Sequence, residues 1–190
     1  MERRTFLKRL TNLLGGVFTL LLAIPGLFYL VDPRNRPARS NSFRPVGKLS
    51  GLPLSADGKP AAPVQAVIRD NRRDAWTVHL DEHIGRVWLV RIGDQVRAFT
   101  AICPHLGCSI NYEKSQQRFI CPCHNGTFHA STNDRLGQRL TVSGSTNPAP
   151  RSMDELEVRL VEIPESDGDF EIEVKYEDFI SGLHEAVPST

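Results

Sequence analysis

Cys103-Pro-His-Leu-Gly-Cys108 and Cys121-Pro-Cys-His124 are the two stretches that decide how this chain is interpreted. Thiolate and imidazole are side chains that bind iron and zinc. A zinc finger keeps its cysteines and its histidines in separate pairs, Cys-x₂₋₄-Cys and His-x₃₋₅-His, whereas each stretch here interleaves the two residue types. Four cysteines in 190 residues are also too few for a framework held together by disulfides alone. The spacing therefore favours an iron–sulfur centre with mixed ligands over zinc.

A [2Fe–2S] centre with two imidazoles on one iron and two thiolates on the other needs Cys-x-His on one loop and Cys-x-x-His on a second. The chain has both, in Cys103-x-His105 and Cys121-x-x-His124. Two thiolates leave the oxidised centre near neutral, so it is easier to reduce than a four-thiolate centre. The reduction potential then rises from about −400 mV to roughly −150 to +300 mV. The imidazole N–H groups can ionise, so an electron and a proton can leave a substrate together.

These motifs resemble the Rieske iron–sulfur protein of the cytochrome bc-type quinol-oxidising complexes, and the resemblance extends from the N-terminus to the region near Glu157. It implies a mostly β fold, a Rieske-type antiparallel β-sandwich with a small cluster-binding subdomain. It also implies a disulfide between the two remaining cysteines. His124 resembles the exposed ligand that hydrogen-bonds the quinol, and His105 the second imidazole. The implied cofactor ligands are Cys103, His105, Cys121 and His124, and the implied disulfide joins Cys108 to Cys123.

Pro148-Ala-Pro-Arg151 resembles the proline segment that covers the cluster in this family. Two prolines fix φ and remove two N–H donors, which makes a rigid apolar lid. The alternative is an ordinary turn between strands. The residues expected around the cluster are Leu106, Gly107, Gly126, Thr127, Phe128, Pro148 and Pro150.

The chain departs from the family pattern directly after His124. High-potential members have Gly-Ser-x-Tyr there, and the two hydroxyls donate hydrogen bonds to cluster sulfurs, whereas this chain has Asn125-Gly-Thr-Phe128. Hydrogen bonds to sulfur stabilise the reduced centre, so their loss lowers the potential. A compensating role for Thr127 depends on whether its hydroxyl points inward. We therefore hypothesise a low-potential centre suited to menaquinol.

The N-terminus combines an export-like motif with an apolar span. Arg3-Arg-Thr-Phe-Leu-Lys8 resembles a twin-arginine signal within residues 1–12. Residues 13–31 carry no charge, and at 1.5 Å per residue they extend about 28 Å, close to the thickness of a bilayer core. No clear cleavage site follows, so the span is interpreted as an uncleaved anchor rather than a removed signal. This predicts a single-pass protein of the bacterial inner membrane, with the cluster domain on the outer face.

The remaining chain divides into a linker and one β domain. Residues 32–43 are polar and contain two prolines, which is typical of a linker. Residues 44–190 are expected to form the domain, with the cluster subdomain at about 102–151. The pattern predicts a hairpin from Trp88 to Thr100 turning at Gly93, and an alternating strand from Phe170 to Tyr176. His79, His83, His129 and His184 have no comparable context and are interpreted as surface or packing residues.

The predicted function is an electron-transfer subunit that takes an electron and a proton from quinol. The implied partners are a cytochrome b-like membrane subunit, a cytochrome c-like acceptor and membrane lipid. A net charge of +1, without a concentrated basic region, argues against nucleic-acid binding. The second interpretation is the Rieske small subunit of a periplasmic molybdenum oxidase such as arsenite oxidase. A soluble Rieske ferredoxin or oxygenase fits less well, since those usually lack the extra cysteine pair.

Overall fold

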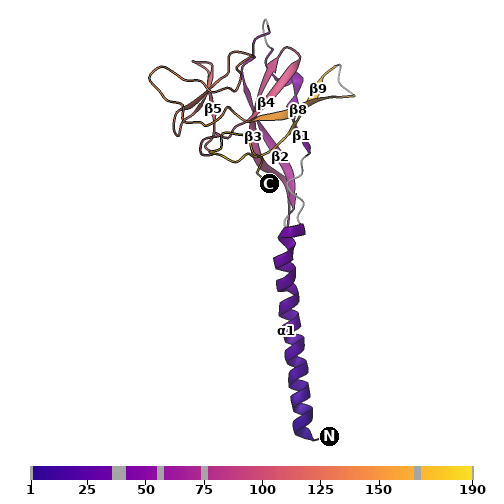
Figure 1. The fold of residues 1–190 in the computed structure, drawn as a ribbon. Helices are drawn as coiled ribbons and strands as arrows, with labels where there is room; N and C mark the ends of the chain where they lie inside the picture. The colour runs from indigo at the N-terminus through magenta and orange to yellow at the C-terminus, as the bar shows by residue number, and fades with distance from the viewer. Residues whose placement is uncertain (1, 36–41, 55–57, 74–76, 165–167, 190) are drawn as a thin grey trace. The chain divides into compact units, whose positions relative to one another are not determined.

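The computed structural model describes residues 2–35, 42–54, 58–73, 77–164 and 168–189. The chain divides into a helical N-terminal unit and a β unit, which are described separately. The elements are α1 (Arg3–Asn35), β1 (Phe43–Lys48), the 3₁₀ helix η1 (Leu49–Gly51), β2 (Val64–Arg73), β3 (Val78–Ile92), β4 (Gln95–Thr100), β5 (Asn111–Glu113), β6 (Arg118–Cys121), β7 (Gly126–His129), β8 (Glu155–Glu162) and β9 (Phe170–Lys175) (Figure 1). The predicted fold class, mostly β with one N-terminal apolar helix, is confirmed.

Helix α1 is a continuous helix whose segment Arg3–Leu30 is long and apolar enough to cross a membrane. Its large apolar side chains, such as Phe18 and Leu30, are exposed in the isolated unit. The helix continues to Asn35, so residues 32–35 of the predicted linker are helical. Residues 36–41 of that linker lie outside the described residues, and Phe43 already belongs to β1.

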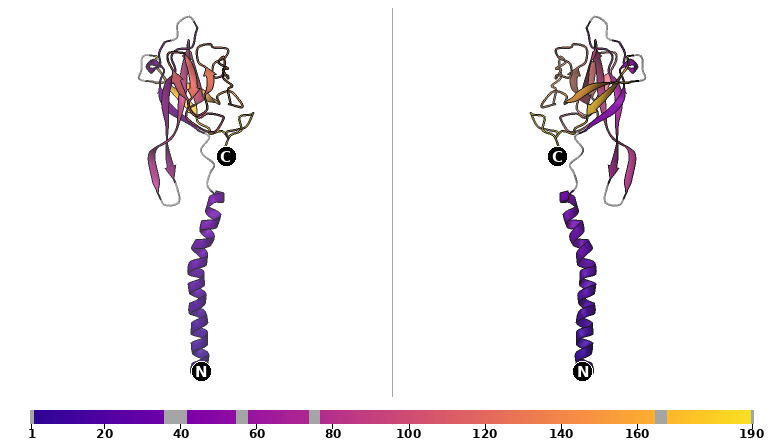
Figure 2. Two further views of the ribbon diagram at one scale, coloured as in Figure 1. Left: turned by 90° about the vertical axis from the view of Figure 1, so that its left-hand side faces the viewer. Right: turned by 90° about the vertical axis from the view of Figure 1, so that its right-hand side faces the viewer.

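The β unit is built on a six-stranded antiparallel sheet with the strand order β1-β9-β8-β4-β3-β2. The predicted hairpin is its centre: β3 pairs with β4 from Val87 to Ile92, and Gly93, with φ of +59°, makes the turn. From Val78 to Gly85, β3 pairs with β2, and the two strands form a ribbon that extends beyond the sheet (Figure 2). A second, three-stranded sheet, β5-β6-β7, follows the hairpin in the chain.

The core is divided into two clusters by the central strands. Both faces of β4 are buried at its end, where Ala98, Phe99 and Thr100 all lie in the core. Ala98 packs into the cluster on one face of the large sheet, with Leu156 of β8 and Ile172 of β9, while Phe99 packs into the cluster beneath the three-stranded sheet. Because side chains alternate across a strand, burying both faces requires cover on both sides. The small sheet supplies the second cover.

Strand β9 shows the predicted alternation clearly, since Ile172 and Val174 are fully buried and Glu173 is not. Tyr176 follows the strand and packs closely against β3. A Cβ atom added to Gly85 would lie 2.1 Å from the Tyr176 hydroxyl oxygen, so only glycine fits at that position.

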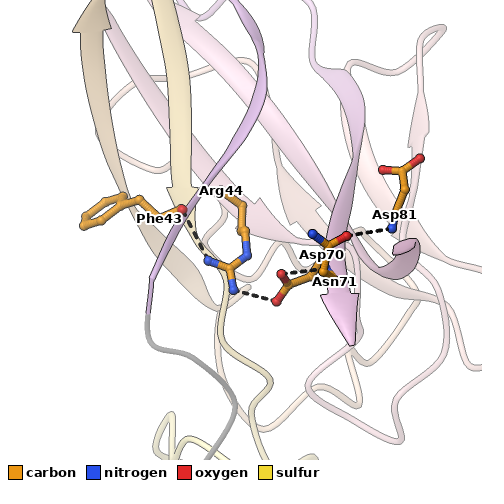
Figure 3. Close-up of polar contacts among 5 residues, drawn as sticks. All are labelled: Phe43, Arg44, Asp70, Asn71 and Asp81. Atoms are coloured by element: carbon orange, nitrogen blue, oxygen red, sulfur yellow. Dashed lines mark hydrogen bonds and ion pairs between the residues drawn. The ribbon is translucent and has the colours of Figure 1, made fainter. Parts of the chain in front are cut away.

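An ion pair joins the two edge strands of the large sheet, near the beginning of the β unit (Figure 3). Arg44 of β1 places Nη2 2.5 Å from Oδ2 of Asp70 in β2, although β1 and β2 are the first and last strands in the sheet order. The second carboxylate oxygen of Asp70 accepts from the Asn71 backbone N–H, and the Asn71 side chain accepts from the Asp81 N–H. These contacts draw the two edges of the sheet together and fix the start of the domain.

Candidate metal centre

The first cysteine–histidine loop follows β4 and is closed by its own backbone. Ile102 and Ser109 form a bridge, the Cys103 N–H donates to the Cys108 carbonyl at 2.7 Å, and the Gly107 N–H donates to the Cys103 carbonyl at 2.9 Å. Gly107 has φ of +77°, which favours glycine. This geometry buries Cys103, leaves His105 half-buried and exposes the side chain of Leu106 at the tip.

The second loop is the turn between β6 and β7. Cys121 pairs with Gly126 across the two strands, and residues 122–125 make the turn, in which Asn125 has φ of +58°. Cys121 is buried at the end of β6, whereas Cys123 and His124 lie on the exposed turn. Each loop thus presents one buried thiol, and each has one histidine nearer the surface.

A disulfide between Cys108 and Cys123 joins the two loops, which confirms the pairing implied by the sequence resemblance. The two Cα atoms are 6.6 Å apart, and the cysteines are separated by 15 positions in the chain. The sulfurs of Cys108, Cys121 and Cys123 lie within 4.8 Å of one another. That group is not a three-thiolate metal site, because two of the sulfurs are bonded to each other.

Cys103 and Cys121 are the free cysteines, and both are buried. A Cβ atom added to Gly126 would lie 3.7 Å from the Cys103 sulfur and 3.6 Å from the Cys121 Cβ, so both thiols line the same small space. Burial is the main cause that raises the pKa of the Cys103 thiol to about 11, and the neighbouring Cys121 thiol acts in the same direction. The imidazoles of His105 and His124 meet edge to face, with ring centroids 4.8 Å apart.

The donor set of two buried thiols and two adjacent imidazoles fits a [2Fe–2S] centre with two nitrogen and two sulfur ligands. The thiols must lose their protons to bind iron. Iron binding thus favours the thiolate form of Cys103, whereas burial alone favours the protonated thiol. The disulfide contributes no ligand but holds the loops together.

Thr127 is the residue whose hydroxyl could compensate for the donors that Gly126 and Phe128 lack. The Thr127 hydroxyl donates to the Leu140 carbonyl at 2.5 Å, so its single proton is used within the fold. Phe128 is fully buried and packs with Phe119. Gly126 is buried beside the thiols, with no side chain.

Asn147, which sequence reasoning missed, connects the proline segment to the second loop. Its side-chain amide donates to the carbonyls of Thr127 at 2.6 Å and Leu140 at 3.1 Å, and its Oδ1 accepts from the Ala149 N–H at 3.1 Å. A Cβ atom on Gly126 would lie 3.7 Å from that oxygen. The only signal in the sequence is a polar residue directly before Pro148-Ala-Pro.

Comparisons with known proteins agree with this site. The Rieske [2Fe-2S] domain matches residues 62–141, which include both loops. The chain is 28% identical over 131 residues to the menaquinol:cytochrome c reductase iron-sulfur subunit of Bacillus subtilis, covering 67% of this chain and 73% of that protein. It is 33% identical over 134 residues to the cytochrome b6-f complex iron-sulfur subunit of Gloeobacter violaceus, covering 68% of each.

A third relative, the cytochrome b6-f complex iron-sulfur subunit of Chlorobaculum thiosulfatiphilum, is 27% identical over 127 residues, and the match spans 59% of that protein. Both the paired loops and the sequence relationships thus lead to one assignment. The chain belongs to the Rieske [2Fe–2S] iron–sulfur protein family.

Proposed function

We propose that this protein is the iron–sulfur electron-transfer subunit of a membrane quinol-oxidising complex of the cytochrome bc type. The observation that carries the proposal is the pair of disulfide-linked loops, which bury Cys103 and Cys121 and bring the rings of His105 and His124 into contact. The relatives named as subunits of menaquinol:cytochrome c reductase and cytochrome b6-f complexes support it. The proposed partners are a cytochrome b-like subunit and a cytochrome c-like acceptor.

Each ligand has a distinct role in the proposed chemistry. Cys103 and Cys121 hold one iron, and His105 and His124 hold the other. When bound, the cluster supplies a one-electron acceptor. The His124 side chain lies on the exposed turn, where it can accept a hydrogen bond from a quinol hydroxyl and take up its proton. The burial of both thiols keeps water from the sulfur ligands.

Menaquinol is the proposed substrate, because the fold offers few donors to the cluster sulfurs. Gly126 and Phe128 have no hydroxyl group, and the Thr127 hydroxyl is bonded to Leu140. Fewer hydrogen bonds to sulfur leave the reduced centre less stabilised, so the potential is low. A centre with a low midpoint potential is suited to accept electrons from a quinol whose own midpoint potential is low. Pro148 and Pro150 are proposed to cover the cluster, and Asn147 holds that segment in place.

Helix α1 is proposed to be a retained membrane anchor, with the Arg3-Arg4 end in the cytoplasm and the cluster domain on the outer face. Its apolar length supports spanning, and the twin-arginine-like motif supports export of a domain that has already folded. Mature protein should keep residues preceding Leu13 and should resist carbonate extraction from membranes. An N-terminus beyond Val31 would contradict retention of the helix.

The central experiment is purification of the full-length protein with its native membrane partners, comparing His124→Ala with His83→Ala. His83 is exposed on β3, outside both loops, and serves as the matched control. We expect His124→Ala to lose the Rieske EPR signal and menaquinol oxidation, while His83→Ala keeps both. Menaquinol oxidation that survives His124→Ala, or co-purification with a molybdopterin subunit instead of cytochrome b, would overturn the proposal.

A further inference from the structure

The residues after β9 form a closed turn that no sequence motif predicted. The Tyr176 hydroxyl donates to Asp178 at 2.8 Å. Farther along, the Ile180 N–H donates to the Val187 carbonyl at 2.9 Å, and the Ser189 N–H donates to the Asp178 carbonyl at 2.7 Å. We call residues 178–189 the C-terminal turn.

The tip of the C-terminal turn contacts the first cysteine–histidine loop. The Gly182 N–H donates to the Pro104 carbonyl at 2.8 Å. A Cβ atom on Gly182 would lie 3.7 Å from the His105 carbonyl oxygen, and one on Gly107 would lie 3.6 Å from the Ser181 hydroxyl oxygen. Gly182 has φ of +82°, a conformation that side chains rarely adopt. The tip is therefore shaped to lie directly against the loop that carries His105.

Arg151 holds the same tip from the side of the proline segment. Its Nη1 donates to the Leu183 carbonyl at 2.7 Å, while its Nε and Nη2 donate to the two carboxylate oxygens of Asp154 at 2.7 and 2.8 Å. Arg151 and Asp154 are 8% and 6% exposed. The Asp154 carbonyl accepts from the N–H of Thr100, where β4 ends before the loop. The buried Arg151–Asp154 pair thus bonds to the tip through the Leu183 carbonyl and to the base of the loop through the backbone of Asp154.

Within the first loop, the Pro104 carbonyl differs from two other backbone carbonyls in where its hydrogen-bond donor lies. The carbonyls of Cys103 and Cys108 accept from N–H groups of the loop itself, whereas Pro104 accepts from the C-terminal turn. The orientation of the peptide group between Pro104 and His105 thus depends on Gly182. We propose that the C-terminal turn is a clamp that positions His105, with Gly182 and Arg151 as its positioning residues. This inference rests on the ligand role of His105 in the proposed function.

The test compares the full-length variant Gly182→Pro with His184→Ala, after loading with the cluster. Proline has no N–H and cannot adopt the φ of Gly182, so it releases Pro104 while the large sheet stays untouched. His184 is exposed on the same turn and serves as the control. The readouts are amide hydrogen exchange of residues 102–109 and the EPR g-values at one fixed pH.

For Gly182→Pro we expect exchange in residues 102–109 to become about fivefold faster, the effect of losing one hydrogen bond, with shifted g-values. Exchange in β8 and β9 should stay unchanged, and His184→Ala should match the wild type. Deletion of residues 179–190 should reproduce the effect.

Unchanged exchange in residues 102–109, or unchanged g-values despite faster exchange, would overturn the clamp. Equal acceleration in β8 and β9 would also overturn it, since that result indicates general destabilisation. Failure of the proposed function would instead appear in the menaquinol assay of His124→Ala, which does not involve the C-terminal turn.

Discussion

Replacing Gly126 with serine adds a hydroxyl beside the cluster thiols without disturbing the backbone. The nearest atoms to a Cβ at this position are the Cys121 Cβ at 3.6 Å, the Asn147 Oδ1 at 3.7 Å and the Cys103 sulfur at 3.7 Å. All three distances are ordinary van der Waals contacts, so the serine fits. From that Cβ, the hydroxyl can turn toward the Cys103 sulfur and donate to it.

The size of the shift in midpoint potential follows from the charge of the group that accepts the new hydrogen bond. A hydrogen bond to a charged group contributes about 1.5–3 kcal/mol, compared with about 0.5–1.5 kcal/mol for a neutral pair. The reduced centre carries one more negative charge than the oxidised centre, so the bond favours it by about 1–1.5 kcal/mol. For a one-electron couple, this difference raises the midpoint potential by about 40–65 mV.

The assay is an EPR-monitored redox titration of the full-length protein. Gly51→Ser is the control, because Gly51 has no neighbouring atom within 4 Å of its Cβ and lies in η1. Its potential should equal that of the wild type. An unchanged or lowered potential for Gly126→Ser, with an intact EPR spectrum, would refute the reasoning. In that case the hydroxyl has donated to Asn147 instead of to sulfur.

Three further predictions concern stability. Cys108→Ser or Cys123→Ser should reduce the stability of the two linked loops by about 3 kcal/mol and lower the fraction of protein that carries the cluster, measured by iron analysis. Full cluster occupancy in either variant would contradict this prediction. Gly85→Ala should lower the free energy of unfolding, measured by chemical denaturation, by about 1–3 kcal/mol, because the added Cβ collides with the Tyr176 ring. Adding Tyr176→Leu to this variant should restore part of the lost free energy. A double variant that is no more stable than Gly85→Ala would contradict the contact between Gly85 and Tyr176. Burial lowers the pKa of His129 below its ordinary 6.5, so the folded protein binds this proton less readily than the unfolded chain. The stability that depends on neutral His129 is therefore present above pH 6.5 and is lost as the pH falls below that value. The free energy of unfolding of His129→Gln should fall less steeply with decreasing pH than that of the wild type. Parallel curves of unfolding free energy against pH would contradict this prediction.

Strands that carry one buried and one wet face were predictable from local pattern. The alternation from Phe170 to Tyr176 corresponds to the observed burial of Ile172 and Val174, because a strand at one side of a core exposes every second residue. Local pattern did not reveal that both faces of β4 are buried, where Ala98 and Phe99 lie on opposite sides of the strand. A strand covered on both faces has no wet side, and the cover comes from a sheet formed elsewhere in the chain.

The sequence by itself determined the cofactor class, the apolar helix and the mostly β fold, since the spacing of Cys and His and the periodicity of apolar residues are local properties. Only the tertiary structure decided the use of the Thr127 hydroxyl, the bonds of Asn147 and the contact of Gly182 with Pro104. The bonds from Thr127 to Leu140, from Asn147 to Thr127 and from Gly182 to Pro104 each join segments that are separated by 13 or more positions in the chain. A single donor can meet many acceptors in an extended chain, and only the packing of the loops, the proline segment and the C-terminal turn selects one.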